Sequence, residues 1–99
     1  MRLNNCKLQS VDFSSAKLVR TDFRNSNLSF ASLDWSNLQN ARLEGANFSH
    51  ADFRGATLDL AWFDSTTIFN GAIFDEYTTL PFSRKKAEIF GMIFMSSKK

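Results

Sequence analysis

Large apolar residues recur at every fifth position over the first two thirds of the chain. Fourteen consecutive fifth positions carry Leu, Phe or Ile, namely Leu3, Leu8, Phe13, Leu18, Phe23, Leu28, Leu33, Leu38, Leu43, Phe48, Phe53, Leu58, Phe63 and Ile68. Two places before each of them stands a small or medium-sized residue, with Met1 as the exception, and the other three positions are mostly polar. Such self-similarity at a fixed period is the signature of a repeat protein.

The spacing within the unit predicts an extended chain that bends at regular intervals. Residues on the apolar side follow one another at steps of two and then three. A step of two is the alternation of a β-strand, whereas the step of three requires a bend that brings the next small residue back inside. An α-helix, with about 3.6 residues per turn, would spread the apolar positions around its whole circumference. We therefore expect an all-β coil around a core that includes Phe13, Leu18, Phe23, Leu38, Phe48, Phe53, Leu58 and Phe63.

The unit resembles that of a known family. The units at 26–30, 46–50 and 51–55 read SNLSF, ANFSH and ADFRG. This order of a small residue, Asp or Asn, Leu or Phe, and two polar residues resembles the pentapeptide-repeat family, over roughly residues 1–70. The resemblance implies a right-handed quadrilateral β-helix with four units per coil, so that the fourteen units make a solenoid of about 3.5 coils.

Residues one full coil apart would then lie side by side. We expect ion pairs between coils, with Arg24 beneath Glu44 and Asp34 beneath Arg54. The same register predicts two outward columns, in which residues one coil apart lie next to each other. One column comprises Arg2, Asp22, Arg42 and Trp62, with a cation–π contact between the last two. The other comprises Lys7, Asn27, Asn47 and Thr67. Exposed pairs of this kind are worth at most about 1 kcal/mol each, so we expect them mainly to fix the register of the coils.

The repeat is expected to end near residue 75. The motif recurs one residue late at 72–75, which indicates that Gly71 is an inserted residue in a bulge or tight turn. We assign residues 1–75 to the solenoid and 76–99 to a C-terminal cap. In the cap, Ser83 is a candidate N-cap for a short helix over about 83–90, Gly91 a candidate C-cap, and 92–95 an apolar extension. Such a cap would cover the open edge of the last coil.

Composition and charge narrow the classes of function. An apolar content of 43% is too high for a disordered chain, and no apolar run approaches the roughly 20 residues that span a bilayer. The N-terminal segment lacks the apolar stretch of a secretory signal, so cytoplasmic residence is the default expectation. Over residues 1–70, seven Lys and Arg balance seven Asp and Glu. This body lacks the basic stripe typical of nucleic-acid binding, so we expect neither a nucleic-acid partner nor a membrane span.

Nothing in the sequence points to catalysis, and we predict no enzyme activity, no metal and no cofactor. His50 is the single histidine and stands at an outward position, flanked in its column by Phe30 and Asn70. A general base would need an orienting carboxylate and a nucleophile nearby, so we interpret His50 as a surface residue. Cys6 falls in an inward, small-residue position, which is typical of a buried and unreactive thiol. The sequence contains no glycine-rich phosphate loop and no metal-ligand spacing.

Large apolar residues at outward positions are candidate contacts with a partner. They are Phe30, Trp35, Leu60 and Trp62, with Arg42 next to Trp62 in its column. Phe69 also falls at an outward position, where we expect the cap to hide it. Trp and Arg are typical anchors of protein interfaces, although single exposed apolar residues are also common on protein surfaces. We interpret the chain as a non-catalytic interaction or scaffold module that presents rigid faces to a protein partner or to its own copy.

The resemblance implies an alternative function. Quinolone-resistance-type pentapeptide proteins resemble a DNA duplex in shape and charge and bind type II topoisomerases. Their repeat is matched in this sequence, but their acidic surface and the loops that interrupt their coils are not. Since a neutral body makes a poor DNA mimic, this function is the runner-up.

The two ends of the solenoid are candidates for self-association. Leu3 and Leu8 lie in an N-terminal coil that no cap sequence precedes, while Phe90 and Phe94 lie in the C-terminal cap. An open backbone edge is tolerable if it frays or if something stacks on it, and a third alternative is that the sequence is a piece of a longer chain. Closed symmetric dimers are the commonest oligomers, so we predict a homodimer through one end and leave open which end is used.

Overall fold

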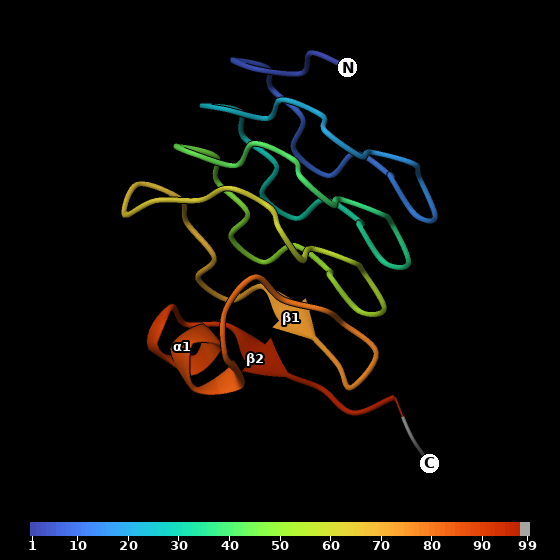
Figure 1. Ribbon diagram of the computed structural model, residues 1–99, viewed down its shortest axis with the longest axis vertical. Coiled ribbons are helices and arrows are strands. Elements are labelled where there is room, and N and C mark those ends of the chain that lie inside the picture. The colour runs from blue at the N-terminus through green and yellow to red at the C-terminus, as the bar shows by residue number, and fades with distance from the viewer. Residues whose placement is uncertain (98–99) are drawn as a thin grey trace.

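The chain winds into a rod of stacked coils that a short cap closes at one end. The computed structural model describes residues 1–97, with the N-terminus at one end of the rod and the cap at the other (Figure 1). Outward residues of neighbouring coils pair as parallel bridges, for example Arg2 with Asp22 and Asp22 with Arg42. This register places four five-residue units in each coil, and the rod therefore has four faces.

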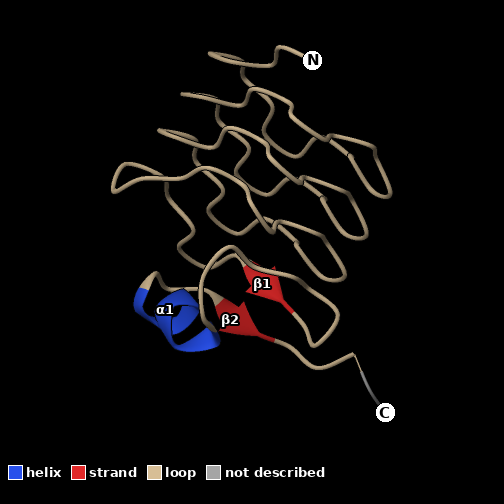
Figure 2. Ribbon diagram, viewed as in Figure 1, coloured by secondary structure: helices blue, strands red, loops and turns tan. Residues whose placement is uncertain are grey.

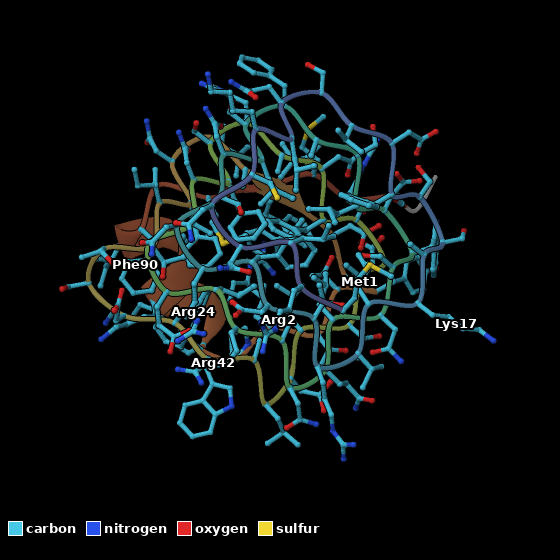
Figure 3. The ribbon with its side chains drawn as sticks, turned by 90° about the horizontal axis from the view of Figure 1, so that it is seen from above. Met1, Arg2, Lys17, Arg24, Arg42 and Phe90 are labelled. Carbon is cyan, nitrogen blue, oxygen red and sulfur yellow. The ribbon has the colours of Figure 1, made fainter. Side chains whose placement is uncertain are left out.

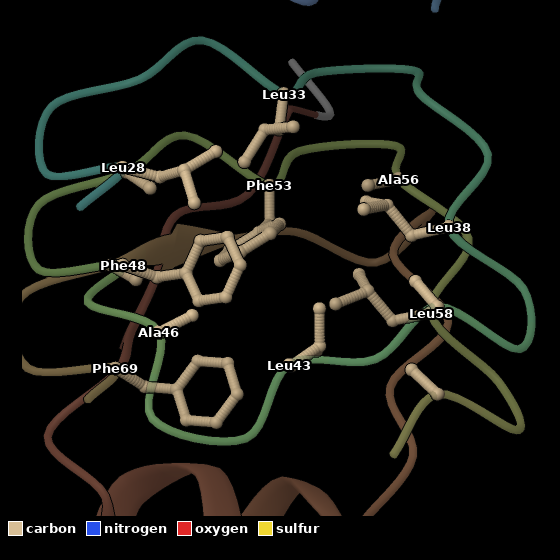
Figure 4. Close-up of a cluster of buried hydrophobic side chains, with 14 of the residues drawn as sticks. Leu28, Leu33, Leu38, Leu43, Ala46, Phe48, Phe53, Ala56, Leu58 and Phe69 are labelled. Atoms are coloured by element: carbon tan, nitrogen blue, oxygen red, sulfur yellow. The ribbon is translucent and has the colours of Figure 1, made fainter. Parts of the chain in front are cut away.

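We number the four faces in chain order. The first face comprises residues 1–5, 21–25, 41–45 and 61–64, and the second comprises 6–10, 26–30, 46–50 and 67–71. The third comprises 11–15, 31–35, 51–55 and 72–77, and the fourth comprises 16–20, 36–40, 56–60 and 78–80. In Figure 4, Leu28, Leu33, Leu38 and Leu43 point inward from four successive sides. The first face, with Leu43, is thus opposite the third, with Leu33.

Each regular corner is made by a residue in the left-handed backbone conformation. The last residue of the unit has φ near +60° at ten non-glycine positions, among them Phe30 at 60°, Trp35 at 59° and Leu60 at 64°. This conformation costs a residue with a Cβ atom about 1–2 kcal/mol, and glycine or asparagine adopts it most readily. The pairing between coils must therefore hold the bulky corner residues in a conformation that they would not choose alone.

The Asp or Asn in the second position of the unit has a structural role. Its side-chain oxygen accepts a hydrogen bond from the backbone N–H two residues later, over 2.9 to 3.1 Å, at Asp12, Asp22, Asn27, Asn37, Asn47 and Asp52. This Asx turn shapes the corner that follows. The preference of the repeat for Asp or Asn at this position thus has a local cause and requires no catalytic explanation.

The core is a stack of inward Leu and Phe side chains along the axis of the rod (Figure 4). Most of the core predicted from the repeat is buried, namely Leu18, Phe23, Leu38, Phe48, Phe53 and Leu58. Phe13 and Phe63 lie nearer the two ends and are only partly buried. Because each coil covers the one before it, burial is most complete in the middle of the rod.

The predicted position of the phase slip is wrong. The extra residue lies in the corner at 64–66, since Asn47 pairs with Ile68, one residue beyond the usual interval. Ile68 consequently points outward and is 45% exposed, whereas Phe69 is 2% exposed and stacks on Phe48 with ring centroids 5.9 Å apart. Gly71 is not an insertion but an ordinary corner residue with φ of 74°. Ile68 therefore takes the place in the outward column that was expected for Thr67.

A second corner, at 75–77, is widened in the same way. Thr57 pairs with Thr79 in the next coil, so the coiled part of the chain continues beyond residue 75 and comprises four coils. At this corner, Thr78 Oγ1 accepts the N–H of Asp75 at 3.0 Å and donates to the carbonyl oxygen of Phe53 at 2.8 Å. The hydroxyl thereby ties the widened corner to the preceding coil.

The corner at 64–66 repeats this arrangement two faces earlier. Thr67 Oγ1 accepts the N–H of Asp64 at 3.2 Å and donates to the carbonyl oxygen of Leu43 at 3.0 Å. Both corners read Phe-Asp-x-x-Thr in the sequence, at 63–67 and 74–78. This short pattern marks where the five-residue period gains a residue.

The cap consists of one helix and one strand (Figure 2). Strand β1 (Ile73–Phe74) lies in the last coil, helix α1 (Arg84–Ile89) follows it, and strand β2 (Ile93–Phe94) pairs with β1 in parallel. The hydroxyl of Ser83 accepts the N–H of Lys86 at 3.1 Å and caps the helix N-terminus. Gly91, with φ of 82°, turns the chain from α1 into β2.

Aromatic side chains close the interior beneath the cap. Phe82 and Phe90 flank α1 in the sequence, and their ring centroids lie 5.0 Å apart. Phe82 also contacts Phe63 at 5.2 Å and Phe69 at 5.5 Å. These edge-to-face contacts are favourable for aromatic pairs. The cap therefore continues the core of the solenoid instead of resting loosely on its end.

Candidate interaction surface

The structure divides the candidate contact residues between two opposite faces. Phe30 and Trp35 occupy the two corners that border the third face. Leu60 occupies the corner that enters the first face, on which Arg42 and Trp62 pair as neighbours. The five residues therefore do not form one patch but lie in two separate groups.

One border of the third face carries a stack of rings. The Phe30 ring lies nearly parallel to the His50 ring, with 4.8 Å between centroids and 16° between planes. The His50 ring in turn covers Gly71, where a Cβ atom would lie 2.6 Å from the imidazole. Glycine at 71 is thus required both by its left-handed φ and by the ring above it.

The other border carries a second aromatic pair, which sequence reasoning missed. The Trp35 ring covers Gly55, where a Cβ atom would lie 2.5 Å from the indole, and it contacts the Tyr77 ring at 5.8 Å. Tyr77 reaches this position because the widened corner at 75–77 shifts it into the corner column of Trp35. The missed signal was the Phe-Asp-x-x-Thr pattern at 74–78, which places Tyr77 in a turn.

The first face carries a network of alternating charges. Asp22 pairs with Arg24 at 2.8 Å, and Glu44 in the next coil pairs with Arg42 at 2.7 Å. Figure 3, viewed along the rod, shows Arg24 and Arg42 close together on this side. The Arg42 guanidinium also lies over the Trp62 ring, 5.9 Å from its centroid, at a distance typical of a cation–π contact. Trp62 is thus partly engaged by the protein itself.

The expected ion pairs between coils are replaced by pairs within one unit. Arg24 bonds to Asp22 and not to Glu44, while Arg54 bonds to Asp52 at 2.8 Å and not to Asp34. Residues two apart in an extended segment lie on the same side of the chain, and an Arg two residues after an Asp can reach its carboxylate. Hydrogen bonds from Arg24 lower the pKa of Asp22 to about 2.

Asp75 is the one buried carboxylate of the third face. Burial works to raise its pKa, but hydrogen bonds from Ser97 Oγ, the Gly55 N–H and the Tyr77 N–H outweigh burial and lower it. Asp75 therefore stays ionised and holds the widened corner together. Its role is structural.

The four residues proposed at the dimer ends differ in exposure and contacts. Leu3 and Leu8 are only partly buried in the first coil, whereas Phe90 packs among the aromatic rings of the cap. Phe94 contacts Phe74, and the Arg84 guanidinium covers its ring at 3.7 Å. Phe90 and Phe94 are partly buried as well, so burial by itself does not single out one end of the rod.

The structure places His50 and Cys6, the two residues considered for chemistry, in separate surroundings. His50 contacts Phe30 and Gly71, and Cys6 Sγ lies 3.4 Å from the carbonyl oxygen of Asn4. No group of three or more His, Cys, Asp and Glu in this part of the chain is placed to hold a metal ion. In the same range, no helix has the length and apolar character needed to cross a bilayer.

The geometry defines a β-solenoid repeat protein with a five-residue unit, and comparison with known proteins agrees. The family described as pentapeptide repeats matches in eight copies over residues 6–45 and 31–76. This chain belongs to the pentapeptide-repeat family, whose structures are right-handed β-helices. No curated protein matches the sequence.

Two solved structures are similar to this chain. A pentapeptide repeat protein from Nostoc PCC 7120 is 23% identical with a TM-score of 0.62, and the match covers 95% of this chain and 80% of that one. A pentapeptide repeat protein from the thylakoid lumen of Arabidopsis thaliana is 22% identical with a TM-score of 0.43, covering 89% of this chain and 69% of that one. At this identity, the Nostoc likeness establishes the fold alone.

Proposed function

We propose that this protein is a non-catalytic interaction module that presents rigid faces to a protein partner. The observation that carries the proposal is the placement of large, exposed aromatic side chains at fixed positions on paired coils. Trp35 and Trp62 are 58% and 60% exposed and lie on opposite sides of a rod whose backbone is hydrogen-bonded coil to coil. Exposed Trp side chains on a rigid support are typical anchors of protein interfaces.

The alternative of DNA mimicry has less support from the charges. The chain has a formal net charge of +2, and its first face carries equal numbers of acidic and basic residues, namely Arg2, Asp22, Arg24, Arg42, Glu44 and Asp64. A DNA mimic requires negative charge over most of its surface. We therefore place the contact with a partner on individual faces and not on the whole rod.

Site-specific photo-crosslinking in the cell tests this function. A photoreactive phenylalanine analogue is placed singly at Trp62, Lys7, Trp35 and Lys17, so that each face carries one probe. We expect a discrete crosslinked partner from at least one face. The control is Phe53→Asp, which buries a charge and unfolds the rod, and it should lose that product. Absence of a fold-dependent product from all four faces would refute the proposed function.

A further inference from the structure

The third face differs from the other three because exposed aromatic rings border it on both sides. Phe30 stands at the edge shared with the second face and is 62% exposed, while Trp35 and Tyr77 stand at the edge shared with the fourth face. Each of these rings contacts glycine backbone or another ring of the protein. More than half of each Phe30 and Trp35 side chain nevertheless remains open to solvent.

The charge of this face is opposite in sign to that of the whole chain. Within its four segments, one base stands against five acids, which are Asp12, Asp34, Asp52, Asp75 and Glu76. The second and fourth faces each carry one more Lys or Arg than Asp and Glu, and the first face is balanced. Negative charge is therefore concentrated on the one face that the aromatic rings border.

The single base on the third face is already engaged. Arg54 donates two hydrogen bonds to Asp52, at 3.0 and 2.8 Å, which neutralises that carboxylate. Asp34 accepts a hydrogen bond from Ser14 Oγ at 2.8 Å, and it interacts with the charge of Arg54 without forming an ion pair with it. Asp34 directly precedes Trp35 in the chain, and Glu76 directly precedes Tyr77. Each exposed ring on this border thus has a carboxylate as its neighbour.

A ring face next to a carboxylate matches the chemistry of an arginine side chain. The planar guanidinium stacks on aromatic faces and pairs with a carboxylate through two hydrogen bonds. We propose that the third face binds an extended, arginine-bearing segment of a partner protein, an inference that rests on the interaction function proposed above. Its guanidinium groups stack on Trp35 and Phe30 and pair with carboxylates such as Asp34.

Charge complementarity selects this occupant over the others. An acidic or neutral segment would meet repulsion or no attraction on the third face, and nucleic acid would be repelled. A second copy of the chain could offer the basic residues Arg84, Lys85 and Lys86 of α1, all of which are exposed. Binding of a second copy would raise the mass with protein concentration, so the experiment separates it from a partner segment.

The two tryptophans provide the reporters for a direct test. Acetylated hexa-arginine amide is titrated into the full ¹⁵N-labelled chain at low salt, and the indole N–H signals of Trp35 and Trp62 are followed by NMR. Because the net charge of the chain is +2, general electrostatics does not favour a polycation. We expect a saturating shift of the Trp35 signal, no shift of the Trp62 signal, and weaker binding as salt screens the contact.

Two matched substitutions test the role of the carboxylate. Asp34→Asn and Asp59→Asn remove the same charge from the same position of the unit, and each aspartate accepts one side-chain hydrogen bond from the preceding coil. Asp59 lies on the fourth face, away from the rings of the third. We expect Asp34→Asn to weaken hexa-arginine binding about threefold to fivefold, as loss of one exposed ion pair does, and Asp59→Asn to leave it unchanged.

Each result decides the proposal. Equal shifts of both indoles, equal effects of the two substitutions, or no saturating shift up to about 2 mM peptide would overturn it. A shift of Trp35 that depends on protein concentration without peptide, together with a doubled mass, would assign the face to a second copy and also overturn it. If crosslinking yields a partner while hexa-arginine does not bind, the interaction function stands and only this inference fails.

Discussion

The hydroxyl of Thr78 joins two coils, because it donates a hydrogen bond to the carbonyl oxygen of Phe53 at 2.8 Å. Thr78 Oγ1 also accepts the N–H of Asp75 at 3.0 Å, so one side chain both closes a widened corner and anchors it. We expect Thr78→Val to destabilise the protein by about 1–3 kcal/mol, since the Asp75 N–H loses its partner and the Phe53 carbonyl oxygen keeps only the Ala56 N–H. Thermal or urea unfolding measures the loss.

Thr57 supplies the matched control for this substitution. Thr57 stands on the same face and pairs with Thr79 through its backbone alone. Thr57→Val should change the free energy of unfolding by no more than about 0.5 kcal/mol, as substitutions away from specific contacts do. Equal effects of the two substitutions would show that the Thr78 hydroxyl does not hold the corner.

Gly55 is required because the Trp35 ring covers it. Gly55→Ala meets two penalties, a left-handed φ of 72° and a Cβ atom 2.5 Å from the indole. The left-handed conformation costs about 1–2 kcal/mol. The close Cβ contact can be relieved only if the Trp35 ring moves. In a Trp35→Gly background only the first penalty remains, so we expect the same substitution to cost less there. A double-mutant cycle measured by urea unfolding gives the difference, and a coupling of zero would contradict the contact.

The sequence was sufficient to predict the repeat and most of the core. The residues at every fifth position from Leu3 to Phe63 point inward as expected, because the fixed order of inward and outward residues in each unit determines which side chains face the core. Beyond Phe63 the pattern became ambiguous, because Ile68 and Phe69 are adjacent and both are large and apolar. Only the hydrogen bonds of the widened corner at 64–66 decide between them. Periodicity alone contains no information about such an insertion.

The contacts between corner residues of neighbouring coils could not be predicted from the five-residue unit. A bend was required by the spacing, but the left-handed conformation of the corner residue sets where its side chain points. That direction places Trp35 over Gly55 and Phe30 on His50. Contacts between residues one coil apart depend on this orientation, and so do the ion pairs, which form within a unit and not between coils.

Phe53 and Leu60 are both large and apolar, but they differ in exposure, so substitutions at the two positions should affect stability differently. Phe53 is fully buried, and Phe53→Ala should cost about 3–5 kcal/mol because it leaves a cavity in the core. Leu60 is 67% exposed and has φ of 64°, so Leu60→Asn should be neutral or slightly stabilising, since Asn tolerates this conformation better. Chemical denaturation compares the two. A loss below about 1 kcal/mol for Phe53→Ala would mean that its ring contributes little to the core.

Stability should fall at acidic pH because several carboxylates accept hydrogen bonds in the folded state. Hydrogen bonds from Arg24 lower the pKa of Asp22 from 3.8 to about 2. A folded-state pKa below the unfolded one contributes stability that is present above about pH 4 and is lost as the pH falls towards 2. We expect the melting temperature to drop in this range, and Asp22→Asn to make the drop smaller. Lys17→Ala, which changes a charge elsewhere, should leave the pH profile unaltered.

Self-association through the first coil is the remaining prediction about assembly. Leu3 and Leu8 are only partly buried there, whereas Arg84 covers Phe94 at the other end. Residues 1–20 contain four basic residues and a single acid, Asp12, so two identical ends bring like charges together. Added salt screens this repulsion, and we expect light scattering at high salt to give twice the mass of one chain. Leu3→Arg should then restore the monomer mass while Phe94→Arg does not, and a monomer mass for the unmodified chain at every salt concentration would reject the dimer.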